Sequence, residues 1–153
     1  MIPEARLACY GSGPLQTELS KFVSINGLDT FIKINGYTTD ICKNYQSAGF
    51  SLLTSQGEGY CLSIIESLSE GCPVAAYRVP YGPEELIKHG HTGVLSLYGE
   101  VQRLAVEIAN VMRCHEKHEA MCHSAWHAAQ AVSEDKVAGQ WKALLEELLL
   151  RGN

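Results

Sequence analysis

Two glutamates, Glu58 and Glu66, flank the start of a predicted helix and are the side chains best placed to do chemistry. Glu58 stands between two glycines in a loop, and Glu66 follows eight positions later in an otherwise apolar helix. A helix N-terminus attracts an anion, and carboxylates accept hydrogen bonds from hydroxyl groups. The pair therefore suits a polyhydroxylated anionic ligand. The alternative is that Glu58 only helps to cap the helix and Glu66 only faces solvent; the residues alone leave both open.

Two earlier loops, each after a predicted strand, offer further contacts to a ligand. In the first, residues 11–14, glycines let the backbone approach a ligand closely. Taken alone, this loop is predicted to be a tight turn, because Gln16 stands where the dinucleotide-binding fingerprint needs its third glycine. In the second loop Tyr37 can lie against a flat ligand group, whereas Thr39 or Asp40 caps the next helix.

Short β-like runs alternate with helix-like runs along the chain. Strands are predicted at residues 6–10, 30–34, 50–54, 73–77 and 92–97. Helices are predicted after residue 14, at 40–46, 62–69 and 84–88, and from 100 onward with a break near Ser133. This alternation indicates an α/β fold, a Rossmann-like parallel sheet with flanking helices and a helical C-terminal tail. Such sheets bind ligands at the carboxyl ends of their strands.

Composition excludes several classes of protein. The 153 residues have the size of one domain, and 46% apolar residues are too many for a disordered chain. The net charge of −5 argues against broad nucleic-acid binding. We expect no membrane span and no secretory signal, because neither a long apolar run nor a basic leader is visible. Six cysteines without a Cys-x-x-Cys motif are expected to be reduced thiols in a cytoplasmic protein.

Other reactive side chains have weaker patterns. Cys114, His118 and Cys122 share one predicted helix face, where a zinc site competes with the favoured reading of inward thiols and solvated imidazoles. The metalloprotease motif His-Glu-x-x-His fails there by one position. Cys61 stands at a helix N-terminus, which can lower a thiol pKa, but no partner base is indicated. His89 is expected at the C-terminal end of a short helix.

The order and spacing of these motifs over residues 5–97 resemble the donor-binding C-terminal domain of GT-B fold glycosyltransferases of family 4 (group 1). The glutamate spacing and the two glycine-containing loops carry the resemblance together with Tyr45-Gln46-Ser47-Ala48, Glu70-Gly71-Cys72-Pro73-Val74 and residues 82–93. The form Tyr81-Gly82-Pro83 further resembles Firmicute poly(glycerol-phosphate) and surface-protein glycosyltransferases.

The resemblance implies roles in binding a nucleotide-sugar donor, a UDP-hexose or UDP-N-acetylhexosamine. Glu58, in the catalytic centre, would contact the hexose hydroxyls, Glu66 would hold the ribose hydroxyls, and Tyr37 and Thr38 would lie along the base. The remaining donor-binding positions are Gly11, Ser12, Gly13, Ser55, Gly59, Tyr60, Cys61 and Leu62, of which the first three border the diphosphate and the last four offer backbone N–H groups. The family mostly retains the anomeric configuration and uses no metal or other cofactor, since a helix dipole and basic side chains stabilise the leaving group.

The chain departs from the family pattern at its N-terminal side. The acceptor domain, the first strand–helix unit of the donor domain and the Arg and Lys of that unit have no counterpart. We expect residues 1–99 to form a nucleotide-sugar-binding core that lacks this unit, and residues 100–153 to form C-terminal helices of the same domain.

The expected partners are a UDP-sugar and the missing acceptor domain or a partner chain. The apolar stripe of residues 141–150 predicts a homo-oligomer. The isolated chain is expected to be inactive as a hexosyltransferase, and its full-length parent to be peripheral to a membrane.

Two other functions compete with this interpretation. One is a non-catalytic nucleotide-sugar-binding or scaffold module that partners a complete glycosyltransferase. The other is a phosphate- or nucleotide-binding α/β domain of another family, which side chains of Glu58 and Glu66 directed away from the carboxyl edge of the sheet would favour.

Overall fold

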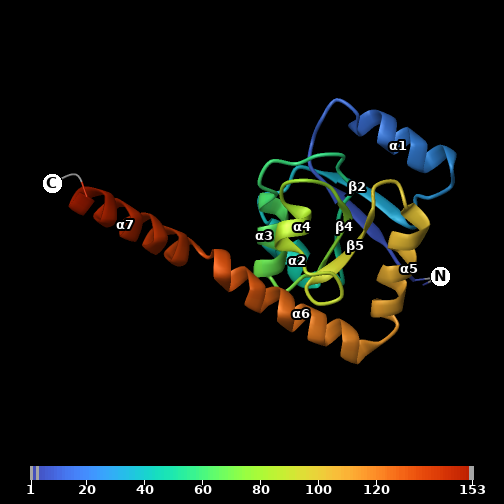
Figure 1. The fold of residues 1–153 in the computed structure, drawn as a ribbon. Coiled ribbons are helices and arrows are strands. Elements are labelled where there is room, and N and C mark those ends of the chain that lie inside the picture. The colour runs from blue at the N-terminus through green and yellow to red at the C-terminus, as the bar shows by residue number, and fades with distance from the viewer. Residues whose placement is uncertain (1, 3, 152–153) are drawn as a thin grey trace. The chain divides into compact units, whose positions relative to one another are not determined.

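The computed structural model describes residues 2 and 4–151, which divide into two compact units between Lys43 and Asn44. The first unit contains β1 (Leu7–Tyr10), α1 (Gln16–Ile25) and β2 (Ile32–Gly36), and α2 (Ile41–Ser47) spans the division (Figure 1). β1 and β2 pair in parallel, with Leu7 opposite Ile32. Asn26 and Gly27, the latter with a φ of +63°, close α1.

The second unit is built on a three-stranded parallel sheet in the order β3-β4-β5. Its elements are β3 (Ser51–Leu53), α3 (Leu62–Ser69), β4 (Val74–Arg78), α4 (Pro83–Leu86), β5 (Gly93–Leu97), α5 (Val101–Met112), α6 (His115–Ala129), the 3₁₀ turn η1 (Gln130–Val132) and α7 (Glu134–Arg151). The predicted α/β fold of parallel strands flanked by helices is confirmed, with the strands in two sheets, one in each unit.

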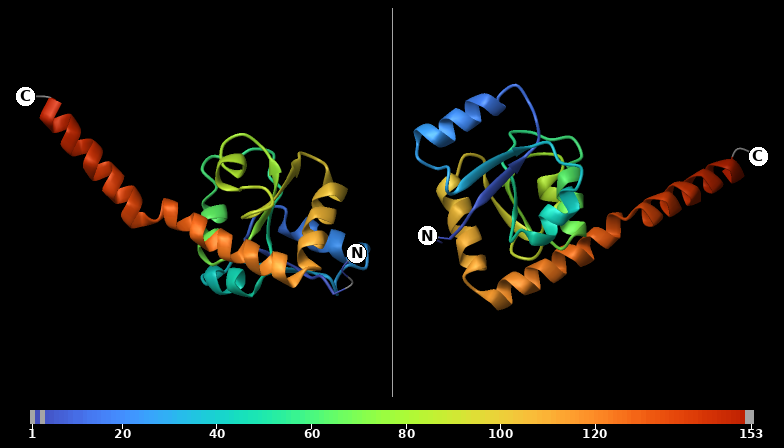
Figure 2. Two further views of the ribbon diagram at one scale, coloured as in Figure 1. Left: turned by 60° about the horizontal axis from the view of Figure 1, so that its bottom comes forward. Right: turned by 180° about the vertical axis from the view of Figure 1, so that it is seen from behind.

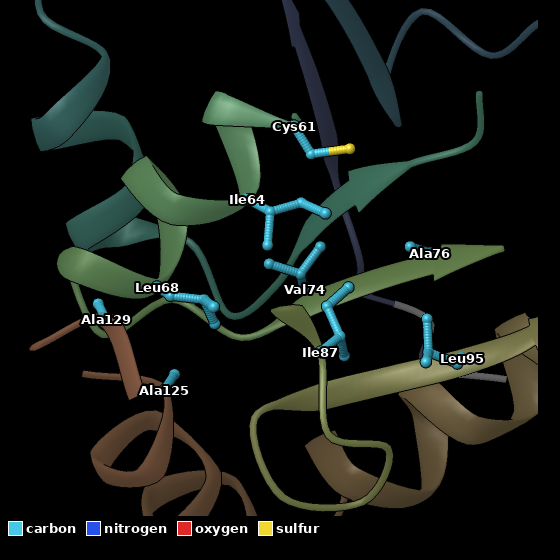
Figure 3. Packing of buried hydrophobic residues seen from close by; sticks show 9 residues of the cluster. All are labelled: Cys61, Ile64, Leu68, Val74, Ala76, Ile87, Leu95, Ala125 and Ala129. Atoms are coloured by element: carbon cyan, nitrogen blue, oxygen red, sulfur yellow. The ribbon is translucent and has the colours of Figure 1, made fainter. Parts of the chain in front are cut away.

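Alternation along β4 gives this sheet two apolar faces. Val74 and Ala76 point to the face covered by α3 and α4, where they pack with Ile64 and Leu68 of α3 (Figure 3). Ala75 and Tyr77 point to the opposite face, where α5 contributes Leu104 and Val111. Helix α6 adds residues to both clusters, so it joins the two faces of the unit. This packing fixes α3 on one face and α5 on the other.

A buried hydroxyl ties α3 to the sheet at the end of the helix far from the glutamate loop. Ser67 is fully buried, and its Oγ lies 2.7 Å from Ser51 Oγ of β3 and donates to the Cys72 carbonyl over 2.8 Å. A buried hydroxyl without partners is costly, so these bonds explain why a serine is stable there. These hydrogen bonds also fix the position of α3 relative to β3.

The C-terminal helices differ from the expected continuous helical tail. Besides the break at Ser133, the chain turns at Arg113 and Cys114 between α5 and α6, because Val111 and Met121 pack into the same cluster. Every residue of α7 is exposed, and Figure 2 shows α7 continuing beyond the sheet of its unit. No helix among the described residues has the length and apolarity needed to cross a bilayer. The expected homo-oligomer stays a prediction.

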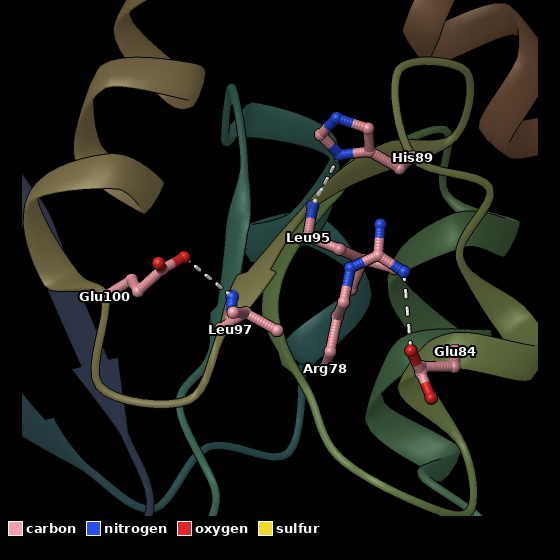
Figure 4. A network of polar contacts seen from close by, with 6 residues as sticks. All are labelled: Arg78, Glu84, His89, Leu95, Leu97 and Glu100. Carbon is pink, nitrogen blue, oxygen red and sulfur yellow. Dashed lines mark hydrogen bonds and ion pairs between the residues drawn. The ribbon is translucent and has the colours of Figure 1, made fainter.

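Two histidines do not behave as the sequence predicts. His89 lies beyond α4, which ends at Leu86, and its Nδ1 accepts a hydrogen bond from the Leu95 N–H of β5 over 3.0 Å (Figure 4). His118 does not face water: its Nε2 lies 2.7 Å from the Gly49 carbonyl, and Cys122 Sγ is 3.7 Å from the same nitrogen. Both imidazoles thus form contacts within the second unit, although His89 is exposed and His118 is half-buried.

Gly93 is the position at which the sheet tolerates no side chain. It lies opposite Val74 in the register of β4 and β5, and a Cβ built there would be 2.1 Å from the Val74 carbonyl oxygen and 3.0 Å from Ile87 Cγ2. Backbone and a buried core side chain cannot both move aside, so only glycine allows α4 and its following loop to close over the strand.

We predict that Gly93→Ala lowers the free energy of unfolding by about 3 kcal/mol, because overpacking forces the β4–β5 pair apart. Gly139→Ala in α7 is the control: nothing lies within 4 Å of its Cβ position, and it should change stability by less than about 1 kcal/mol. Urea denaturation followed by circular dichroism measures both. Equal effects of the two substitutions would contradict the close approach.

Candidate functional site

In the first unit, the structure brings together the two loops that the sequence singles out. The Gly11 N–H donates to the Gly36 carbonyl over 2.7 Å just beyond the carboxyl ends of β1 and β2. Gly11 has a φ of +129°, a backbone conformation that favours glycine. Residues 11–13 and Tyr37 are exposed, and Thr38 Oγ1 accepts the Asp40 N–H over 3.1 Å. The loops therefore present backbone groups and an aromatic ring at one edge.

In the second unit, the remaining predicted residues gather around the N-terminus of α3. The loop that contains Ser55 and Glu58 follows the carboxyl end of β3, and Gly59 and Tyr60 lead into the helix. Ser55 and Glu58 are half-buried, whereas Gly59, Tyr60 and Leu62 are exposed. The Ile64 N–H donates to the Cys61 carbonyl over 2.9 Å, and the N–H groups before it at the start of the helix are available to an anion.

Glu66 lies in the second turn of α3, on the side away from the sheet. Its side chain is exposed, as are those of Leu62 and Ser63, while Ile64 and Leu68 turn into the core. An exposed carboxylate agrees with both readings of this residue, since a ribose would approach from solvent. In chain order both glutamates follow β3, Glu58 in the loop after the strand and Glu66 in α3.

Cys61 joins this loop to the loop after β4, a contact that sequence reasoning missed. Its side chain is 5% exposed, and its thiol donates to the Tyr81 carbonyl over 4.0 Å. A Cβ on Gly82 would lie 2.4 Å from the Cys61 sulfur, so the glycine lets the two loops touch. The sequence marks Tyr81-Gly82-Pro83 as a turn, but nothing in it indicates a partner twenty positions away.

Backbone strain is concentrated at the same contact. Cys61 and Tyr81 have φ values of 55° and 62°, and they are the non-glycine residues of the described chain in which φ is positive. Such conformations cost free energy and persist where the surroundings enforce them, as at ligand-binding loops. Here the enforcing contact is between the loop after β3, which contains Cys61, and the loop after β4, which contains Tyr81.

The helix N-terminus does not lower the pKa of the Cys61 thiol. Burial and, to a smaller extent, the nearby Glu58 carboxylate raise this pKa from its ordinary 9.0 to about 11. Desolvation and a like charge therefore outweigh the helix dipole. The thiol is protonated at neutral pH and acts as a packing group and weak donor.

The sulfur and imidazole groups of α6 do not assemble a metal centre. Among residues 2 and 4–151, no three His, Cys, Asp or Glu side chains are arranged to hold an ion. His118 is engaged with the Gly49 carbonyl, which leaves Cys114 and Cys122 without the third ligand that a zinc site needs. A surface cavity of about 460 Å³ lies near these residues, at the amino end of β5 and between α5 and α6. None of the residues that line it belongs to the candidate donor-binding site.

The chain is similar in sequence and structure to known proteins. The poly(glycerol-phosphate) alpha-glucosyltransferase of Bacillus subtilis is 29% identical over 97% of this chain and 22% of its own length. The GtfA subunit of the UDP-N-acetylglucosamine–peptide N-acetylglucosaminyltransferase of Streptococcus pneumoniae is 25% identical over 97% of this chain and 30% of its own.

A similar solved structure is the Anabaena protein HepE in complex with UDP, with a TM-score of 0.86 and 26% identity over 95% of this chain and 42% of the other. The chain thus spans well under half the length of each of these relatives. The model of the family "Glycosyl transferases group 1" matches residues 1–114, about three quarters of the sequence. With this match, the chain belongs to the group 1 glycosyltransferases and has part of their GT-B fold.

Proposed function

We propose that this chain is the nucleotide-sugar-binding part of a retaining glycosyltransferase that transfers a hexosyl group from a UDP-hexose or UDP-N-acetylhexosamine. The observation that carries the proposal is the loop with Glu58, which follows the carboxyl end of β3 and leads into the N-terminus of α3, the helix that carries the exposed Glu66. The complex of the similar HepE protein with UDP supports the choice of nucleotide.

The diphosphate and both sugars of the donor have matching groups on the second unit. The diphosphate lies against the free N–H groups of residues 59–62, where the helix dipole also favours negative charge. Glu58 accepts hydrogen bonds from the hexose hydroxyls, and Glu66 accepts them from the ribose hydroxyls.

The chemistry follows from these contacts without a metal or other cofactor. As the bond from the sugar to the diphosphate breaks, negative charge grows on the leaving oxygen, and preorganised donors aimed at that oxygen lower the barrier. Glu58 orients the hexose and, as an anion, favours the developing positive charge on its ring. The protonated Cys61 is no nucleophile in this proposal.

Transfer also needs a site for the acceptor, which we assign to a domain or partner chain outside residues 1–153. The named relatives support a cell-surface glycan, polymer or protein as acceptor and a cytoplasmic, membrane-peripheral parent protein. The alternative is a non-catalytic nucleotide-sugar-binding or scaffold module that partners a complete enzyme. It is supported by the structure of a GtfA/B complex, in which a protein similar to this chain assembles with a second one.

We predict that Glu66→Ala weakens UDP binding by about ten- to a hundredfold, since hydrogen bonds to a charged acceptor are lost. Isothermal titration with UDP measures this. Glu70→Ala is the matched control: Glu70 stands at the other end of α3, where it accepts from Gln46 Nε2 over 2.7 Å, and UDP affinity should not change. Wild-type affinity in Glu66→Ala would refute the ribose contact.

The purified chain of 153 residues is expected to bind UDP-sugars but not to turn them over. The acceptor must be bound beside the donor for transfer, and this chain spans at most 42% of the similar proteins named above. A radiolabelled UDP-glucose and UDP-N-acetylglucosamine assay, with the added acceptor poly(glycerol phosphate), tests this. Sugar transfer or sustained donor hydrolysis by the chain alone would overturn the expectation.

Alkylation tests the state of Cys61. Because its thiol pKa is raised to about 11, iodoacetamide should modify it slowly at pH 8 and faster as the pH rises toward 11, while the exposed Cys42 reacts readily. Glu58→Gln removes one cause of the raised pKa and should speed the reaction at Cys61. Peptide mass spectrometry measures both sites. Labelling of Cys61 as fast as Cys42 at pH 8 would contradict a buried, protonated thiol.

A further inference from the structure

The surface around the start of α3 is acidic, although a diphosphate is a dianion. Residues 54–69, which form the glutamate loop and α3, contain Glu58 and Glu66 and no Lys or Arg. The loop and helix after β4, residues 79–86, add Glu84 and Glu85, again with no Lys or Arg. Backbone N–H groups alone would have to hold the diphosphate against four carboxylates.

Arg78 is the cation that the fold places at this edge. It is the last residue of β4, and the alternation of that strand puts it on the same face as Val74 and Ala76, the face covered by α3. Because the Cys61–Gly82 contact joins the following loop to the start of α3, Arg78 and the α3 N-terminus belong to one cluster of loops.

The guanidinium of Arg78 forms one ion pair and keeps its other N–H groups available. One nitrogen, Nη1, lies 3.4 Å from Glu84 Oε1, a long contact, and 39% of the side chain is exposed (Figure 4). A guanidinium carries five N–H donors in a planar fork, and carboxylate contact through one nitrogen leaves the others to bind phosphate oxygens. Glu84, in the first turn of α4, thus orients the fork instead of neutralising it.

We propose that Arg78 binds the diphosphate of the donor and stabilises the charge that develops on it when the sugar leaves. The inference rests on the proposed function, since it assigns the cation of the same nucleotide site. In this arrangement the diphosphate lies between the N-terminus of α3 and the Arg78 guanidinium. The four surrounding carboxylates favour ligand groups that carry hydroxyls.

Titration of the 153-residue chain with UDP and with uridine tests the proposal. Arg78→Gln should weaken UDP binding by at least about tenfold, as expected for the loss of a charge-assisted hydrogen bond, and should leave uridine binding unchanged. Arg78→Lys keeps the charge without the fork and should recover part of the affinity.

Arg103→Gln is the matched control. Arg103 lies in the first turn of α5, after the carboxyl end of β5, and forms a similar long ion pair of 3.8 Å with Glu100, but it belongs to the helix on the opposite face. It should change neither affinity. Thermal denaturation of all three variants verifies that each one is folded.

The titrations distinguish a failure of the proposed function from a failure of the Arg78 contact. A chain that binds neither UDP nor uridine refutes the proposed function and, with it, this inference. A chain that binds UDP equally well with and without Arg78, or that loses as much affinity in Arg103→Gln, refutes the inference and leaves the proposed function standing. An equal loss for UDP and uridine in Arg78→Gln also refutes it, because a diphosphate contact cannot affect uridine.

Discussion

The contact between Cys61 and Gly82 is the constraint on which the candidate site depends. A side chain at position 82 would collide with the Cys61 sulfur, so the two loops at the carboxyl ends of β3 and β4 can only touch because one of them has a glycine there. Both Cys61 and Tyr81 accept left-handed backbone conformations to keep this contact. The N-terminus of α3 is thereby fixed beside the end of β4, with Ser67 anchoring the far end of the helix.

Electrostatics then decides what this edge can bind. The helix N-terminus and Arg78 favour an anion at one point, while the surrounding glutamates repel anions and accept hydrogen bonds from hydroxyls. A simple phosphate meets more carboxylates than cations there. A ligand that combines a compact anionic group with flanking hydroxyls satisfies both kinds of group, and a nucleotide sugar is such a ligand.

Sequence patterns predicted the order of strands and helices well, because periodicity and glycine turns are local signals. They located α3 at residues 62–69, with Glu58 in the loop before it and Glu66 within it. The division of the strands into two sheets and the break at Cys114 were not predictable, since both depend on packing between distant segments. The raised pKa of Cys61 was not predictable either, because burial by residues twenty positions away cannot be inferred from a helix N-terminus.

Helix α7 has a consequence for cooperativity. An 18-residue helix with all its side chains exposed gains no stability from a core, so its order rests on local terms such as the ion pair of Arg151 with Glu147. Its helix–coil equilibrium is therefore set apart from the global unfolding of β4 and β5 and responds separately to temperature. Any surface that covers Trp141 and the leucines after it would couple α7 to the rest of a larger assembly, turning a locally fraying segment into part of one cooperative transition.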